Sequence, residues 1–477
     1  MTEQLKRQFD LLALRIAMDL TGDNPQVDIQ LQCHESGKRK VIAEWGVQVS
    51  AIGLPTNLDR SGRFYSGYSF DFPPDILNEV SKAIASSGYQ ESPLWLHLAK
   101  PIGYLNLVPW EQLLQPALGI PMLRLPDFIA NPPRESPNKF EVALCGSAPA
   151  AKSEFTVTDH LTGIAELLLA TVPRSTTVHI FADIELYDEL VARIAQRQLS
   201  NVIVHDPASS SGLAVPDRQY TLSDPLGRVQ NPWLVWMRDA LGGRSIDMVQ
   251  FLTHGYMLRD SGALALAESP LQNRDRKFSR FVDAAELLAF LTQSGAWSAA
   301  FSSPEQNYSE MGLRLLADTI AQMRPGPVLH HETRLDPQRE ALADAYRFLF
   351  GRSHAAPPSS PSLFTYCHPS LITHDELTVK SMNFRSRSAP SAPPATAEDP
   401  ISAAYAGAEF VPSWIGSSQR YIEQRRHDVE RILRDDDATT YSSRSERIEH
   451  AQVIEDTLQE IEMELVNVLA SRNLGGN

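Results

Sequence analysis

The chain has 477 residues, 43% of them hydrophobic, and a formal net charge of −15 at pH 7. This length predicts roughly two to four domains, and the acidic balance disfavours direct nucleic-acid binding or attachment to an anionic membrane surface. Three scattered cysteines, Cys33, Cys145 and Cys367, form no CxxC pair, which argues against a disulfide framework or a zinc ribbon and favours a reducing compartment. Because no apolar run reaches the length of a membrane-spanning helix, we expect a cytoplasmic protein.

Residues 1–130 are predicted to form a mixed α+β region. An amphipathic segment at residues 11–17 precedes two runs whose alternation predicts half-buried strands, "VDIQLQC" and "VIAEWGVQVSAIG". Further along, "LVPWEQLL" at residues 107–114 places a proline and a tryptophan before a short helical pattern, and "MLRLP" is the strand expected after it. We interpret this region as a module that leads into the next domain and not as a separate enzyme.

Residues 131–351 alternate between strand-like and helix-like segments, the pattern of a parallel sheet with crossover helices. The predicted strands are "FEVALCG", "TTVHIFAD", "NVIVHD", "IDMVQFLTHG", "GALALAE", "AWSAAFSS" and "GPVLHH". Several of them are apolar without strict alternation, which predicts burial on both faces of the sheet. The expected fold is therefore a three-layer α/β domain.

The last third of the chain divides into a linker and a helical segment. Residues 352–410 are rich in Pro, Ser and Ala, so we expect a linker with two short adhering pieces, "SLFTYC" and "LITHDELTVKSMNF". Residues 411–477 are predicted to form a helical hairpin that packs on itself, on the body or on a partner. Its second helix follows the 4-3-4-3 spacing of a short coiled coil, at Ile454, Leu458, Ile461, Leu465 and Val468.

Two strand ends carry polar side chains that chemistry can use. His254 and Gly255 follow the apolar run "FLT", and Ser302 and Ser303 end the run "WSAAFSS". Functional groups gather at the carboxyl ends of strands in open α/β sheets, so we expect His254 and Ser303 to face each other across neighbouring strand ends. Simpler interpretations stay open: His254 as a satisfied strand-end histidine, and Ser303 as the cap of a helix that starts at Pro304.

The order of elements from "FLTHGYMLRDSGALALAE" to "ADAYRFLF" resembles the CHAT domain, the caspase-like and separase-like peptidase fold often found beside tetratricopeptide repeats. In that family a strand ends in His-Gly, a hairpin strand and a helix follow, and the next strand ends in the nucleophilic cysteine. Here Gly312 leads the following helix, Asp336 lies in the later loop, and Tyr346, Phe348 and Phe350 close the domain. The segment "LVPWEQLL" is similar to the Pro-Trp-Glu block upstream of the peptidase core. The resemblance covers roughly residues 107–350 and implies a caspase-like, mostly parallel sheet with helices on both faces.

The resemblance also implies a site for nucleophilic acyl transfer. His254 takes the imidazole role, Gly255 supplies a backbone NH to the oxyanion, and the nucleophile position falls on Ser303, or on Ser302 if the correspondence shifts by one. The family's cysteine is absent. A hydroxyl needs a closely placed base, whereas a thiol is partly ionised near neutral pH, so this departure favours a retired site. Cys145 is interpreted as a buried strand residue, and Cys367 would have to fold back to supply the missing thiol.

The sequence is compatible with three functions. The resemblance favours a degenerate pseudo-peptidase that acts as a scaffold or regulatory partner in a bacterial stress-response or defence system, contacting a protein partner through its C-terminal helices. An active endopeptidase that uses Ser303 and His254 and is activated by a partner is the alternative, and an α/β protein that binds a small ligand in its crevice is the third. No cofactor is expected, because no GxxxxGK[ST] or GxGxxG motif lies where a phosphate needs it. Adjacent residues of a strand point to opposite faces, so His330 and His331 cannot easily bind one metal ion together, and we expect no metal site there.

Overall fold

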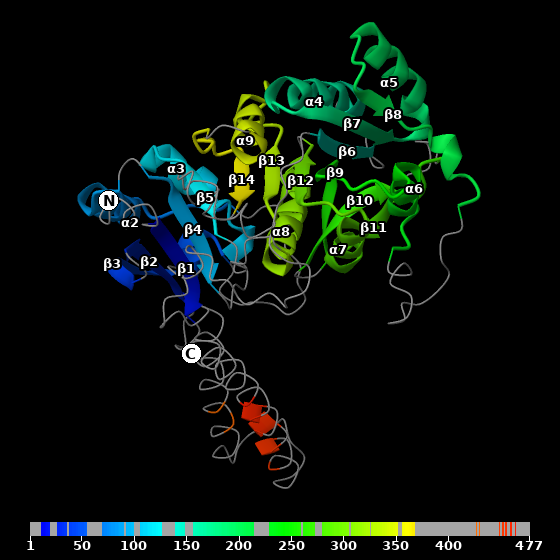
Figure 1. The fold of residues 1–477 in the computed structure, drawn as a ribbon. Helices are drawn as coiled ribbons and strands as arrows, with labels where there is room; N and C mark the ends of the chain where they lie inside the picture. Colours follow the sequence, from blue (N-terminus) through cyan, green and yellow to red (C-terminus); the bar gives the residue numbers. More distant parts are fainter. Residues whose placement is uncertain are drawn as a thin grey trace, which may run out of the picture.

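The computed structural model describes fourteen stretches of the chain and a few single positions near the C-terminus (Figure 1). The stretches are residues 11–19, 26–35, 38–54, 69–89, 92–99, 105–125, 139–147, 156–213, 229–258, 261–271, 279–304, 307–324, 326–351 and 355–367. The protein is an α/β protein with a mixed, mostly parallel central sheet.

The described part of the N-terminal region contributes five strands to this sheet, in the order β3-β2-β1-β4-β5. The amphipathic segment at residues 11–17 lies in an inner strand, where side chains of both faces are buried, because β1 pairs antiparallel with β2 and parallel with β4. Among the described residues, helices α2 and α3 pack against this part of the sheet. The bounds are β1 (Leu11–Asp19), β2 (Gln26–Glu35), β3 (Lys38–Gln48), β4 (Leu94–Ala99), β5 (Met122–Arg124), α2 (Pro74–Ser87) and α3 (Trp110–Leu118).

The middle of the chain builds the parallel part of the sheet, in the order β13-β12-β9-β6-β7-β8. The predicted alternation of strands and helices is confirmed. The strands are β6 (Lys139–Ser147), β7 (Ser175–Ala182), β8 (Val202–Val204), β9 (Met248–Leu258), β12 (Ser298–Ser303) and β13 (Val328–Glu332). The helices are α4 (Val157–Thr171), α5 (Ile184–Gln196), α6 (Pro232–Leu241), α7 (Ala284–Gln293), α8 (Asn307–Met323) and α9 (Glu340–Phe350).

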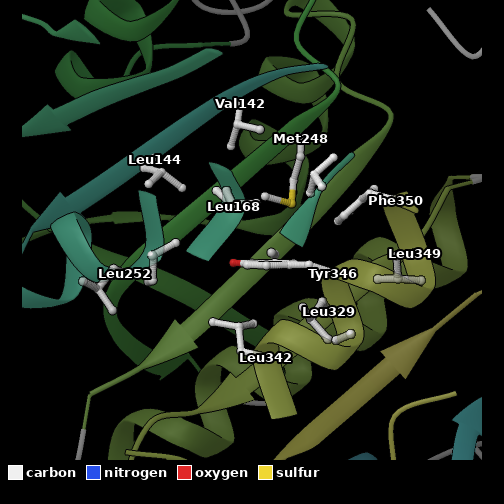
Figure 2. Packing of buried hydrophobic residues seen from close by; sticks show 14 of the residues in the cluster. Val142, Leu144, Leu168, Met248, Leu252, Leu329, Leu342, Tyr346, Leu349 and Phe350 are labelled. Atoms are coloured by element: carbon white, nitrogen blue, oxygen red, sulfur yellow. The ribbon is translucent and has the colours of Figure 1, made fainter. Parts of the chain in front are cut away.

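The helices form two layers, one on each face of the parallel strands. One buried cluster joins the strands to α4, α5 and α9, and a second joins their other face to α6, α7 and α8. In the first cluster, the ring of Tyr346 projects from α9 among apolar side chains of the strands, including Leu144 and Leu252 (Figure 2). Apolar runs without alternation are explained by this arrangement, because both faces of each strand are covered.

Strand β14 (Leu363–Tyr366) joins the N-terminal and middle parts into one continuous sheet. It runs antiparallel to β13 along four residue pairs and meets β5 at a single parallel pair, Tyr366 with Arg124. This strand is the piece "SLFTYC", which the composition of the region placed in the linker as an adhering piece. It lies inside the sheet instead, and all four of its residues are buried. The second expected piece, "LITHDELTVKSMNF", lies outside the described residues.

Buried charges cross the junction that β14 completes. Glu111, from the Pro-Trp-Glu segment at the start of α3, accepts two hydrogen bonds from the guanidinium of Arg124, at 2.6 and 2.8 Å. Arg124 also donates to the hydroxyl of Tyr366 at 2.8 Å, and that hydroxyl donates to Asp318 of α8. Burial by itself would lower the pKa of Arg124. The negative charge of Glu111 outweighs this effect and raises the pKa above its usual value, so this guanidinium stays charged.

A second buried ion pair lies beside the first. Arg314 of α8 donates to Glu332 at the end of β13, at 3.1 Å, and to the backbone carbonyl of Leu107. Gln112 of α3 donates to the same carboxylate at 2.7 Å. The N-terminal region, the central strands and α8 are therefore held together by charged groups that are almost completely removed from water.

A three-stranded antiparallel sheet branches from the end of β9. Its other members are β10 (Ser261–Ala267) and β11 (Ser279–Val282), in the order β9-β10-β11. Helix α8 packs on it at close range through two glycines. A Cβ on Gly312 would lie 2.6 Å from the backbone nitrogen of Tyr256, and a Cβ on Gly262 would lie 2.0 Å from the carbonyl oxygen of Gly312. No larger residue fits at this backbone-to-backbone contact.

The predicted helical hairpin at residues 411–477 lies mostly outside the described residues. The single positions described there have helical backbone, and Val429, Ala451 and Leu458 among them are buried. Arg426 donates to Glu455 at 3.2 Å, which links two segments of this region. The hairpin itself stays a prediction. Within the described ranges, no helix has both the length and the apolar composition needed to cross a bilayer.

Candidate functional site

The two segments predicted to carry the site lie on neighbouring strands. β9 and β12 are neighbouring parallel strands, and Leu252 is in register with Ser302. Ser303 is the last residue of β12, as predicted. His254 lies inside β9, which continues to Leu258 and pairs with β10, so the predicted strand end at His254 is wrong. The pairing of β9 with β12, in contrast, stops near it, at Leu252. Both residues still lie near the edge where the parallel pairing of these two strands stops, which is where functional groups gather in open α/β sheets.

The side chains of His254 and Ser303 point to opposite faces of the sheet. Successive residues of a strand alternate between faces, so His254 shares a face with Leu252, which packs in the cluster of α4 and α9. Ser303 shares a face with Phe301, which packs in the cluster of α6, α7 and α8. Ser302, in register with Leu252, lies on the same face as His254.

Ser303 is completely buried and has a structural set of contacts. Its hydroxyl donates weakly to the backbone carbonyl of His331, at 3.4 Å, and its own carbonyl accepts from the hydroxyl of Thr333 at 2.6 Å. The helix-capping interpretation of Ser303 is wrong, because the residue ends β12 while α8 begins only at Asn307. Strand pairing with β13 determines its position instead.

Ser302 belongs to a closed chain of buried polar groups. The side-chain amide of Gln250 donates to the Ser302 hydroxyl at 2.9 Å, and the hydroxyl of Tyr346 donates to the side-chain oxygen of Gln250. Burial raises the pKa of Tyr346, so its hydroxyl remains a donor at neutral pH. All three side chains are buried. These hydrogen bonds fix the side chain of Ser302 between β9 and α9.

His254 is almost fully buried, at 5% exposure, and burial lowers its pKa. The imidazole is therefore neutral at neutral pH. The next residue, Gly255, lies opposite Leu264 where β9 pairs with β10. Its predicted role as an oxyanion donor stays a prediction.

No thiol takes the place of the missing nucleophile. Cys145 lies in β6, and burial followed by the negative charge of Asp183 raises its pKa well above the usual range. Cys367 follows β14, which is separated from β9 by β13 and β12, and burial raises its pKa as well. Both thiols are therefore protonated and enclosed, and neither reaches the end of β12.

Polar residues that the sequence left unassigned share the face of His254. His331, in register with Ser302, lies 3.2 Å through its Nε2 atom from the carboxylate of Asp336. That carboxylate also accepts from the backbone nitrogen of Leu342, at 3.0 Å. Burial would raise the pKa of Asp336, but these hydrogen bonds lower it. The loop position of Asp336 was expected from the sequence; its contact with His331 needs the strand register and was not.

The adjacent His330 points away from His331, as strand alternation predicts. Its ring packs against Phe364 of β14, on the face that also carries Arg314, and burial followed by the positive charge of Arg314 lowers its pKa. Within the ranges that the structure describes, no three His, Cys, Asp or Glu side chains are grouped as metal ligands.

We expect the protein to lose stability as the pH falls from about 6.5 to about 4. Burial, then the charge of Arg339, lowers the pKa of His160 to about 4, and burial, then the charge of His179, lowers that of His205 to about 4. The unfolded chain binds protons at these histidines first, so the stability present above pH 6.5 is lost on acidification.

Denaturant midpoints at about pH 7.5 and about pH 5 measure this loss, and His160→Gln is the test variant. Gln retains an acceptor for the Arg339 guanidinium, which lies 3.3 Å from the Nδ1 atom of His160. The variant should show a smaller difference between the two midpoints. An unchanged difference would contradict the assignment.

Searches of protein-family models, curated proteins and solved structures returned no match to this chain.

Proposed function

We propose that the chain is a CHAT-like, caspase-fold protein whose peptidase site is retired, and that it acts as a scaffold or regulatory partner in a bacterial stress-response or defence system. The resemblance in the order of elements is one support. The adjacency of β9 and β12, with His254 and Ser303 at the same rim, agrees with that order. The bacterial setting rests on the family resemblance alone.

One observation supports the proposed loss of peptidase activity: the side chains of His254 and Ser303 project from opposite faces of the sheet. Acyl transfer needs the nucleophile and the imidazole on the same scissile group, because the imidazole exchanges protons with the atoms that the nucleophile attacks and expels. A hydroxyl on the far face cannot reach that group. Ser302 lies on the correct face but accepts a hydrogen bond from Gln250 in a closed buried chain.

The proposal assigns partner contact to residues 411–477. A comparison of three forms of the protein tests it: the full chain, the double variant His254→Ala with Ser303→Ala, and a chain ending at residue 410. The shortened chain keeps β14 and hence an intact sheet. The double variant should restore the phenotype of a deletion strain and recover the same partner, and the shortened chain should recover none.

Loss of complementation by a double variant that unfolds at the unchanged temperature would overturn the retired-site proposal. Labelling of Ser303 by a fluorophosphonate in the presence of the partner would do the same and would favour the active endopeptidase. Partner recovery by the shortened chain would remove the contact from the C-terminal region.

A further inference from the structure

Two aromatic side chains are exposed side by side close to His254. Tyr256 of β9 is 46% exposed and Phe281 of β11 is 43% exposed. Their rings stack with centroids 4.3 Å apart and an interplanar angle of 24°. In the described part of the chain, the other large exposed apolar side chains are aliphatic or Met. Exposed paired aromatics are unfavourable in water and mark interaction sites more often than single apolar residues do.

The pair lies on the same face of the three-stranded sheet as His254. Ala265 of β10 is opposite His254 on one side and opposite Phe281 on the other, so these three residues form one row across the sheet. Ala263 is opposite Tyr256 in the next row on that face. We call Tyr256 and Phe281, with the small floor of Ala263 and Ala265, the aromatic shelf. The other face of this sheet carries Leu264 and Leu266 and packs in the cluster of α8.

The shelf has a rigid base. Helix α8 crosses beneath it at Gly312, whose missing side chain lets the helix meet the backbone of Tyr256 directly. Gly262 of β10 makes the matching approach to α8 from the neighbouring strand. A surface held by backbone packing loses little conformational entropy when it binds a partner, which favours specific binding.

The shape of the site indicates an extended occupant. Among the described strands, β11 pairs only with β10, so its other edge offers backbone donors and acceptors next to Phe281. A strand added there would place every second side chain on the shelf face, roughly 5 Å from Phe281. A helix would need a groove long enough for residues at i, i+3 and i+7, whereas this patch is two rings wide.

We propose that the aromatic shelf and the outer edge of β11 together bind an extended segment of a partner protein that carries aromatic or large aliphatic side chains at alternate positions. The inference rests on the proposed function as a protein-binding scaffold and adds the surface and the chemistry of the segment that it recognises. Main-chain pairing with the edge supplies the register, and ring contacts with Tyr256 and Phe281 supply the preference for aromatic side chains.

The test uses a phage-displayed library of random peptides, selected on the full-length protein and on its Phe281→Ala variant. The expected result is a class of peptides with aromatic or aliphatic residues at i and i+2 that only the unchanged protein enriches. In fluorescence anisotropy, Tyr256→Ala and Phe281→Ala should each weaken binding of such a peptide by about tenfold or more. Methylation of alternate peptide amides should abolish binding, because it removes the donors that pair with the edge.

The matched control is Ile203→Ala. Ile203 is also a 40% exposed apolar residue on an edge strand, β8. If peptides bound nonspecifically to exposed apolar residues on edge strands, this substitution would weaken binding as much as Phe281→Ala does. Its peptide affinity should equal that of the unchanged protein. Thermal unfolding of every variant at the unchanged temperature establishes that the shelf variants remain folded.

Three results would overturn the proposal. They are peptides enriched with helical spacing, peptides whose binding ignores Phe281, and self-association that depends on Phe281 in the absence of peptide binding. The selection measures peptide binding and does not depend on peptidase activity. If the protein binds a peptide through Phe281 and also hydrolyses peptides, the retired-site proposal fails and the aromatic shelf proposal stands. If the protein hydrolyses nothing and selects no such peptide, the retired-site proposal stands and the aromatic shelf proposal fails.

Discussion

Replacing Glu111 with Gln should lower the free energy of unfolding by about 3 to 5 kcal/mol, because it leaves the buried guanidinium of Arg124 without its counter-charge. Both side chains are 1% exposed and their hydrogen bonds are short, so water cannot compensate. Guanidinium-induced unfolding, followed by tryptophan fluorescence, measures the change. The fully buried Trp110, adjacent to Glu111 in α3, reports on the same junction.

The control is the exposed ion pair of Arg347 with Asp344, whose side chains are 52% and 55% exposed. Asp344→Asn should cost less than about 0.5 kcal/mol, since solvent screens such pairs. A further variant, Glu111→Leu with Arg124→Met, should recover much of the loss, because removing both charges avoids an unpaired buried ion. Equal losses in Glu111→Gln and Asp344→Asn would show that the junction does not depend on this pair.

Gly262→Ala should cost about 3 kcal/mol, and Gly312→Ala a similar amount, because each added methyl group meets backbone atoms that no side-chain rotation can move. At Gly262 the methyl would lie 2.0 Å from the carbonyl oxygen of Gly312 and 2.5 Å from the nitrogen of Leu316. Helix α8 must shift away from the branch sheet to admit either group. Denaturant unfolding gives the loss, and hydrogen exchange in β9 and β10 locates it.

The matched control is Gly46→Ala in β3, where the new methyl would meet only the side-chain oxygen of Gln26 at 3.0 Å. That atom can move, so a change well below 1 kcal/mol is expected. The double variant Gly262→Ala with Gly312→Ala should cost less than the sum of the two losses, because one displacement of α8 relieves both contacts. Strict additivity would mean that the glycines act at separate contacts.

The parallel part of the fold was predictable because buried parallel strands leave a plain trace in the sequence. β6, β9 and β12 appear as continuous apolar runs, and helical patterns of ordinary length separate them. The end of β12 at Ser303 was predictable in the same way, whereas β9 continues past His254 to Leu258. These inferences need only local pattern and the tendency of parallel strands to align their carboxyl ends.

Two features were out of reach for a physical reason. β14 lies in a stretch whose Pro, Ser and Ala content resembles a linker, and only its pairing with β13 and β5 makes it a strand. Which serine shares a face with His254 depends on the register of β9 with β12, because a shift of one residue reverses the faces. Register results from tertiary packing, so the contrast between Ser302 and Ser303 had to come from the structure.

The position of β14 has a consequence for how the protein is made. Translation delivers β5 and β13 before the strand that separates them, so, of the described strands, the one in the middle of the sheet is made last. Until the ribosome has released the chain beyond Tyr366, the nascent protein carries two unpaired inner edges and a half-built set of buried charges. Such edges pair readily with the wrong chain. Biogenesis of this protein should therefore depend on chaperones at that stage more than its finished stability suggests.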